Sequence, residues 1–293
     1  MPTPFAEAVL ALENVMSRPV WVLIEGGRPP FDEIDGGMSR AFFGEREQMK
    51  DCQGPPALLI DSLGGQAGSA YRIASLFRRH CGEFAAVIPR MAKSAATLLA
   101  LGASEIYLGS DAELGPLDAQ LWDTDREEYS SALDEVQALE RLNSVALDVV
   151  DQAMFLLINR TGKKTGILLP PVLHFAAELM QPLLDKIDTV HYTQLSRVLK
   201  VAEDYATRLL QPMYSEDDAK AIARHLVNAY SEHGFAISRE ELGNLLTESL
   251  VDADPQTQSY VDRLEELLVE RQRTFSALGR IERRDAANGR GSE

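Results

Sequence analysis

The spacing of apolar residues divides the chain into a first part that alternates strands with helices and a later part that is almost wholly helical. Continuous apolar runs bounded by glycine or polar residues predict buried strands. They lie at Val20–Ile24, Ala57–Ile60, Phe84–Ile88 and Glu105–Leu108. Helical spacing predicts helices at residues 5–16, 67–80 and 94–101, and residues 28–54 are expected to form a surface loop. This alternation indicates βαβ units and a parallel sheet.

From about residue 126 onward the apolar residues follow a helical period. Helices are predicted over residues 129–157, 172–187, 192–210, 215–230 and 257–278. Ser215 followed by three acidic residues has the pattern of a capped helix start, and an apolar stripe from Tyr260 to Leu278 predicts the packed face of the last helix. We therefore divide the chain into an α/β core at residues 1–125 and a mainly helical region at residues 126–293, which would serve oligomerisation.

The composition is typical of a globular protein, because 45% of the 293 residues are hydrophobic and 25% are charged. A net charge of -16 argues against a nucleic-acid-binding surface, since neutralising phosphates requires clustered Lys and Arg. The two cysteines, Cys52 and Cys81, are too few for a disulfide framework. We therefore expect a cytoplasmic protein. No integral membrane segment is expected, because no uninterrupted apolar run approaches the roughly 18 residues of a spanning helix.

Two short segments carry groups suited to acyl transfer. Gly64 and Gly65 follow a predicted strand, and Ser94 opens an uncharged helix whose next residue is Ala95. Glycine lets the backbone approach a substrate closely and adopt positive φ, and the first NH groups of a helix lack internal partners. These NH groups would stabilise a developing oxyanion beside a serine nucleophile. Either segment alone also suits a βα turn or a helix N-cap, so the combination carries the prediction.

Three segments resemble the serine dehydrogenase proteinase family, which is akin to signal peptide peptidase and belongs to the Clp protease/crotonase superfamily. They read Leu-Leu-Ile-Asp-Ser-Leu-Gly-Gly at 58–65, Val-Ile-Pro-Arg-Met-Ala-Lys-Ser-Ala-Ala-Thr-Leu-Leu-Ala-Leu-Gly-Ala at 87–103, and Leu-Gly-Pro-Leu-Asp-Ala-Gln at 114–120. The resemblance implies an α/β fold with a ββα-spiral core. It also implies a nucleophile at Ser94 and an oxyanion hole at Gly64, Gly65 and Ala95. Relatives usually have Ser-Pro-Gly-Gly, where this chain has Leu63 before the two glycines.

The general base is not fixed by these motifs. Clp-type enzymes place a histidine roughly two dozen residues beyond the serine, but residues 112–125 contain none. Signal peptide peptidases use a lysine, yet no lysine lies between Lys93 and Lys163. A serine hydroxyl needs a neighbouring group to take its proton. The base must therefore come from the helical half, unless the protein is a degenerate enzyme.

Four residues are candidates for the base or its support. His233 lies in a segment, residues 230–235, that resembles the family, and is the first candidate for the base. Lys163 and Lys164 follow the long predicted helix after the core and are the second. Asp118, after Gly-Pro, would orient the base or line the cleft, unless it is a turn residue that satisfies backbone NH groups.

The sequence therefore favours an ATP-independent serine peptidase or hydrolase that acts through a Ser94 acyl-enzyme on a peptide or protein. No metal or cofactor is expected, because the five histidines lack HxxxH or HExxH spacing and there is no GxGxxG loop. The resemblance implies a homo-oligomer. Two rivals remain. A crotonase-type acyl-CoA enzyme would share the oxyanion hole without needing Ser94, and a noncatalytic oligomeric scaffold would keep only the fold.

Overall fold

The computed structural model describes residues 3–29, 31–50, 54–118, 120–123, 128–271 and 276–281. Its contacts group the chain into two compact units. Met1–Asp118 and Val201–Glu293 form the first unit, and Ala119–Lys200 form the second. Residues 201–293 thus belong with the α/β core, whereas the sequence pattern alone placed them in one region with residues 126–200.

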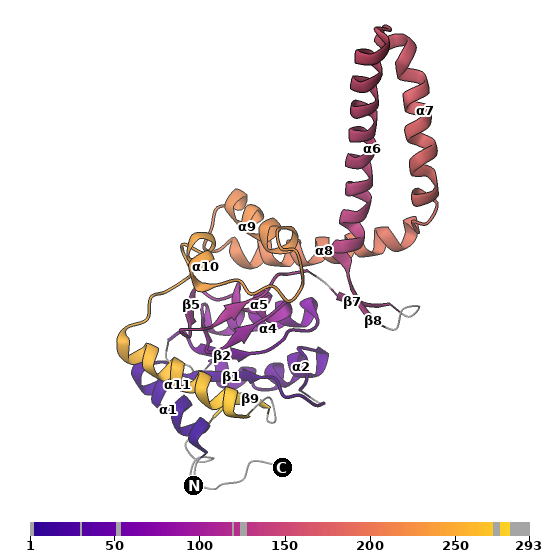
Figure 1. Ribbon diagram of the computed structural model, residues 1–293. Coiled ribbons are helices and arrows are strands. Elements are labelled where there is room, and N and C mark those ends of the chain that lie inside the picture. The colour runs from indigo at the N-terminus through magenta and orange to yellow at the C-terminus, as the bar shows by residue number, and fades with distance from the viewer. Residues whose placement is uncertain are drawn as a thin grey trace. The chain divides into compact units, whose positions relative to one another are not determined.

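The first unit is built on a five-stranded sheet in the order β5-β3-β2-β1-β9 (Figure 1). The strands are β1 (Val20–Ile24), β2 (Ala57–Asp61), β3 (Ala85–Ile88), β5 (Glu105–Leu108) and β9 (Ala277–Arg280). The first four pair in parallel, and β9 runs antiparallel to β1. Every residue of β1, β2 and β3 is buried, which explains why these strands are continuous apolar runs. The predicted parallel strands are confirmed.

Helices cover both faces of this sheet. On one face, α1 (Pro4–Met16) and α11 (Pro255–Arg271) pack in one core with alternate residues of β1, such as Val22. Because successive strand residues point to opposite faces, Trp21 lies on the other face. Its ring is 6.4 Å from Phe42 of α2 (Gly36–Gly44) and 5.9 Å from Phe77 of α4 (Ala67–Cys81), measured between centroids.

The segment 28–54 is not simply the predicted loop. It contains α2 and a short helix, α3 (Arg46–Lys50). Asp35 caps α2 by accepting a hydrogen bond from the Met38 NH at 2.8 Å, and Met38 and Phe42 are buried one turn apart. Three glycines in α2 and the shortness of both helices conceal this pattern in the sequence. Cys52 lies outside the described residues.

The prediction of one helix over residues 257–278 is wrong at its end. Helix α11 ends at Arg271, and Leu278 lies in β9, where it pairs with Leu23 of β1. The open edge of β1 offers backbone partners to this segment, and Gly279 has a positive φ of 93° that a helix does not accommodate. Before α11 in the chain lie α9 (Glu216–Asn228), which Ser215 caps as predicted, and α10 (Arg239–Leu245), which the sequence pattern missed.

The second unit contains a β-hairpin and a helical hairpin. Strands β7 (Gln120–Asp123) and β8 (Glu128–Ser131) pair antiparallel. Helices α6 (Ala132–Thr161) and α7 (Thr165–Leu184) pack together through Met154, Leu168 and Val172, and α8 (Thr189–Leu210) follows them. Helix α7 begins at Thr165 rather than Val172, so Pro170 and Pro171 lie inside it. The packing of Leu168 against α6 accounts for this earlier start.

Candidate active site

Ser94 occupies a strained turn in front of a fully buried helix. All six residues of α5 (Ala95–Ala100) are buried, and Ser94 is the residue immediately before them. Its backbone has φ 49° and ψ -117°, and its side chain makes no capping hydrogen bond. Such a conformation costs a residue other than glycine about 1–3 kcal/mol and is typical of functional turns. The N-cap explanation of this serine therefore fails, and the hydroxyl is left for another role.

The glycine turn after β2 lies directly against Ser94. The two segments pair, because Ser62 NH donates to the Met91 carbonyl at 3.2 Å and Lys93 NH donates to the Ser62 carbonyl at 3.0 Å. Gly64 has a φ of 112°, and a Cβ atom built on it would lie 2.9 Å from the Cβ of Ser94. Glycine is required here both by the backbone conformation and by the close approach. The structure thus brings together the two segments that the sequence singled out.

Some backbone NH groups around this turn already donate a hydrogen bond within the protein, and others do not. Gly64 NH donates to Ser62 Oγ at 2.9 Å. Gly65 has a φ of 139° and is held by Ile34, whose NH donates to the Gly64 carbonyl at 2.7 Å. Within the part of the chain that the structure describes, the NH groups of Gly65 and Ala95 have no hydrogen-bond partner. Two of the three predicted donors therefore remain for a ligand.

Buried carboxylates hold the glycine turn in place. Glu25, which directly follows β1, is 2% exposed. Its carboxylate accepts hydrogen bonds from Ser62 Oγ at 2.6 Å and from Leu63 NH at 2.7 Å. Asp61 binds Arg90 in a bidentate pair at 3.0 and 2.7 Å. Sequence reasoning missed Glu25, although a carboxylate directly after a buried apolar strand is a usable signal of a buried polar role.

His233 and Asp118 meet, although they are far apart in the sequence. His233 Nδ1 lies 4.0 Å from Asp118 Oδ2, and Asp118 is 3% exposed. This nitrogen is buried and has no hydrogen-bond partner among the described residues. Burial lowers the pKa of His233 below its ordinary value, Asp118 partly opposes this effect, and the charge of Lys93 adds to it. At neutral pH the imidazole is therefore neutral, as a general base must be.

Lys93, the residue immediately before Ser94, contacts the segment that carries His233. Its Nζ lies 2.6 Å from Glu113 Oε1 and donates to the carbonyl oxygens of Leu114 and Phe235 at 3.3 and 3.2 Å. The Leu114 carbonyl also accepts from Ile237 NH at 2.9 Å, and Glu113 and Leu114 form β6, which pairs with β4 (Met91–Ala92). The ammonium of Lys93 is thus occupied by structural contacts.

The other two predicted bases follow helix α6 in the chain. Lys163 and Lys164 are exposed at the turn between α6 and α7, in the second compact unit, and none of the contacts described around Ser94 comes from them. Among the residues that the structure describes, no group of three or more His, Cys, Asp and Glu could hold a metal ion.

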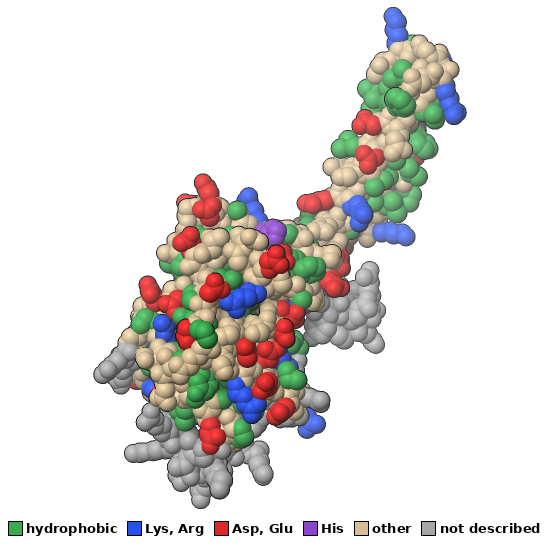
Figure 2. Space-filling model, turned by 60° about the vertical axis from the view of Figure 1, so that its left-hand side comes forward, with side chains coloured by type: hydrophobic (Ala, Val, Ile, Leu, Met, Phe, Trp, Pro, Cys, Tyr) green, Lys and Arg blue, Asp and Glu red, His purple; other side chains and the backbone are tan. Residues whose placement is uncertain are grey.

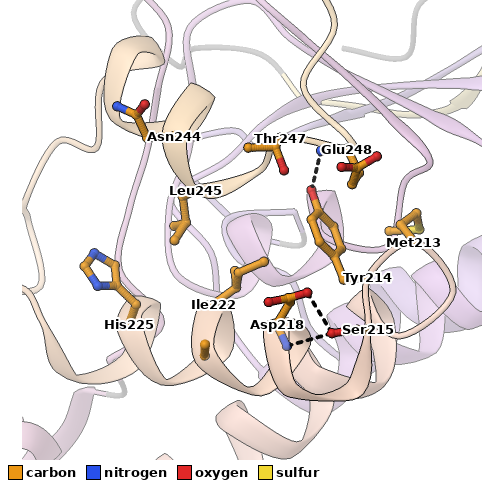
Figure 3. A pocket seen from close by; sticks show the side chains of 11 residues that line it. Met213, Tyr214, Ser215, Asp218, Ile222, His225, Asn244, Leu245, Thr247 and Glu248 are labelled. Carbon is orange, nitrogen blue, oxygen red and sulfur yellow. Dashed lines mark hydrogen bonds between the residues drawn. The ribbon is translucent and has the colours of Figure 1, made fainter.

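A pocket of about 550 Å³ lies in a different part of the first unit, between α9 and the segment after α10 (Figure 3). Some of its polar groups are already paired. Ser215 Oγ binds Asp218, and the Tyr214 hydroxyl accepts from the NH groups of Glu248 and Ser249. Among the described residues, none of the buried side-chain polar atoms without a hydrogen-bond partner lines this pocket.

Comparisons with known proteins bear on this site. Residues 45–161 match the family model of the ClpP-like SDH-type serine proteinases. Two uncharacterised proteins of Methanocaldococcus jannaschii, MJ0137 and MJ1495, are 26% and 24% identical over 65% of the chain. The chain spans about half the length of these relatives, 52% and 50%. A solved structure of an alanine mutant of the 1510-N membrane-bound stomatin-specific protease covers 90% of this chain and 92% of its own, with 12% identity and a TM-score of 0.43.

The match confirms the predicted resemblance to the serine dehydrogenase proteinase family and the Clp-like α/β fold with a helical C-terminal half. At a coarse level it also supports a serine peptidase. The matched residues include the glycine turn, Ser94 and Asp118, and they end before His233.

Proposed function

We propose that this ClpP-like protein is a serine peptidase in which Ser94 forms the acyl-enzyme. The observation that carries the proposal is the backbone of Ser94, held at positive φ beside Gly64 while its hydroxyl makes no capping bond. A strained serine at the start of a buried helix, facing a glycine turn, has the form of a nucleophile turn.

In the proposed reaction His233 acts as the general base and Asp118 orients it. The oxygen of Ser94 attacks the carbonyl carbon of a peptide bond while its proton passes to His233. The C–N bond then breaks, and the amine leaves with the proton from His233. A water molecule, activated by the same imidazole, hydrolyses the ester and releases the acid. The 4.0 Å approach of Asp118 to His233 and the lowered pKa of His233 support these roles.

The tetrahedral oxyanion would be bound by the NH groups of Gly65 and Ala95. Both lack partners within the described chain, and a single such donor is worth about 3 kcal/mol of transition-state stabilisation in other hydrolases. Gly64 contributes space rather than a donor, because its NH binds Ser62. A peptide or protein substrate, ATP independence, cytoplasmic location and homo-oligomerisation belong to the same proposal.

Labelling with a fluorophosphonate probe tests the nucleophile. We expect the wild type to be labelled and Ser94→Ala to lose labelling with unchanged thermal stability. Ser17→Ala is the matched control, because Ser17 also has a positive φ, 53°, but lies at the end of α1. Labelling that persists in Ser94→Ala would overturn the assignment. An unlabelled wild type would favour the noncatalytic scaffold, and acyl-CoA turnover that survives Ser94→Ala would favour a crotonase-type enzyme.

A further inference from the structure

The hairpin of α6 and α7 exposes far more apolar surface than it buries. Only one stripe of α7 is buried against α6, formed by Leu168, Val172, Ala176 and Met180. Large apolar side chains around that stripe are exposed, and Phe155 has 73% of its surface accessible. The others include Leu147, Leu156, Ile158, Ile167, Leu169, Leu173, Phe175, Leu179, Leu183 and Leu184. Hydrophobic side chains line the hairpin in Figure 2.

Such a surface is unusual for a monomeric protein in water. Contiguous exposed apolar patches on monomeric proteins rarely exceed a few hundred Å², and larger ones mark interaction sites. A helix that is apolar on most of its faces is buried in a larger protein or in a membrane. By length and composition alone, both α6 and α7 could cross a bilayer. The exposed apolar surface could therefore be covered either by another protein surface or by lipid.

Charged residues along the hairpin argue against lipid. Asp148 and Asp151 are exposed on α6, and Glu178 is exposed on α7. The two aspartates lie roughly 13–18 Å along the helix from Arg160 at 1.5 Å per residue, which corresponds to the middle of a bilayer if the hairpin spans it. A carboxylate there costs about 2.5–3.5 kcal/mol even on insertion scales. A protein surface can leave these side chains in water.

The spacing of the apolar residues on α6 fits a helical partner. Leu142, Val149 and Leu156 repeat every seven residues, and Val145 lies three residues after the first. All four are at least partly exposed. With these residues at three a positions and one d position, the following d positions are Gln152 and Asn159. A stripe of this kind, apolar at a and partly polar at d, can pack in a helical bundle, where side chains of one helix fill the spaces of another.

The charges of the hairpin are separated along its length. Arg160, Lys163 and Lys164 cluster at the turn, and residues 152–177 contain no acidic residue. The opposite end is acidic on balance, because Asp134, Glu140, Asp185 and Asp188 are exposed there beside the two cations Arg141 and Lys186. Two hairpins side by side in the same direction would place cations against cations. Two hairpins in opposite directions would place the turn of each beside the acidic end of the other.

We propose that the α6–α7 hairpin is the docking surface for the same hairpin of a second copy of this chain, packed antiparallel as a four-helix bundle. Apolar complementarity, heptad spacing and charge complementarity all support this occupant. The proposal does not depend on the chemistry of Ser94, so a catalytically inactive protein would pair in the same way.

Light scattering and sedimentation of the full chain at several concentrations test the pairing. We expect a concentration-dependent assembly that Leu156→Ser with Phe175→Ser weakens at least about tenfold, while circular dichroism stays unchanged because both side chains are exposed. The control is Phe43→Ser, because Phe43 is also an exposed apolar residue but lies on α2, outside the hairpin. A monomeric wild type, or an assembly indifferent to the hairpin variants, would overturn the proposal.

Charge reversal tests the direction of packing. Lys163→Glu with Lys164→Glu, and separately Asp134→Lys with Glu140→Lys, should each weaken assembly about tenfold, equivalent to about 1.4 kcal/mol. Mixing the two variants should restore it, since each turn then meets an end of opposite charge. If single reversal leaves the affinity unchanged, the antiparallel arrangement is wrong. Sedimentation with vesicles containing phosphatidylserine tests the alternative of a lipid partner. Vesicle binding that the hairpin variants abolish would contradict pairing with a second copy.

Discussion

The α/β core and the helical hairpin use similar apolar residues in opposite ways. In β1, β2 and β3 every side chain is buried inside the chain, whereas α7 buries only one stripe and exposes apolar side chains on both sides of it. The core therefore satisfies its own residues and can hold strained or charged groups in fixed positions. The hairpin leaves large apolar side chains uncovered by the described residues. Matched substitutions in the two regions should consequently differ strongly in effect.

The largest difference is expected for histidine. His233→Gln should lower kcat/KM about 10³- to 10⁴-fold, because the proposed base is lost, whereas His174→Gln on α7 should leave it unchanged. His174 is exposed and contacts only Glu178 at 3.3 Å among the interactions described. Peptidase kinetics on both variants provide the measurement. Equal rates for His233→Gln and the wild type would remove this residue from the mechanism.

Glycine should show the next largest difference. A Cβ on Gly65 would lie 2.6 Å from the backbone N and O of Ile34, and the φ of 139° is strained for alanine. Gly65→Ala should therefore lower the free energy of unfolding by roughly 2–4 kcal/mol. Gly166 in α7 has open space around it, so Gly166→Ala should cause no loss. Chemical denaturation measures both. A stable Gly65→Ala variant would mean that the turn can move away from Ile34.

A smaller difference is expected for the buried glutamate. Glu25→Gln keeps the size of the side chain but weakens its bonds to Ser62 and Leu63, so it should lower kcat about 10- to 100-fold with little change in KM. Glu178→Gln on the hairpin should change neither constant. A rise in KM at constant kcat would indicate that Glu25 shapes substrate binding rather than the glycine turn.

The smallest effect concerns pH. Burial lowers the pKa of His233 below its ordinary value of 6.5, so the activity of the neutral base should fall only as the pH drops below that value. Asp118 raises this pKa, and Asp118→Asn should therefore move the acid limb of kcat/KM to still lower pH, in addition to slowing the reaction. The pH profile of His174→Gln should match the wild type. An acid limb that moves upward in Asp118→Asn would contradict the sign of this interaction.

Local patterns in the sequence predicted the elements whose conformation depends mainly on nearby residues. The four parallel strands, the buried helix after Ser94 and the glycine turn each follow from apolar runs or from residues with special backbone preferences. The extent of α2 and the end of α11 could not be read in this way, because short helices and an edge strand are decided by distant packing. The added strand β9 depends on the free edge of β1.

The candidate site shows the same division. Ser94 and the glycines are adjacent because neighbouring strands place them there, and the sequence motif carries that information. The approach of His233 to Asp118 joins segments that no periodicity relates, and Glu25 acts through Ser62, whose own role is visible only in three dimensions. Residue types in the sequence indicated the candidate site residues, whereas the contacts between distant segments show which of them lie close together.

The pairing of β9 with β1 has a consequence for the growing polypeptide. Ile24 finds its partner, Ala277, only after all the residues between them have left the ribosome. Until then the edge of β1 offers unpaired NH and carbonyl groups to any other extended segment. The helical hairpin, built from sequence neighbours, can form much earlier. Truncation before residue 277 would therefore leave an early-formed sheet with a permanently exposed margin and a greater tendency to aggregate.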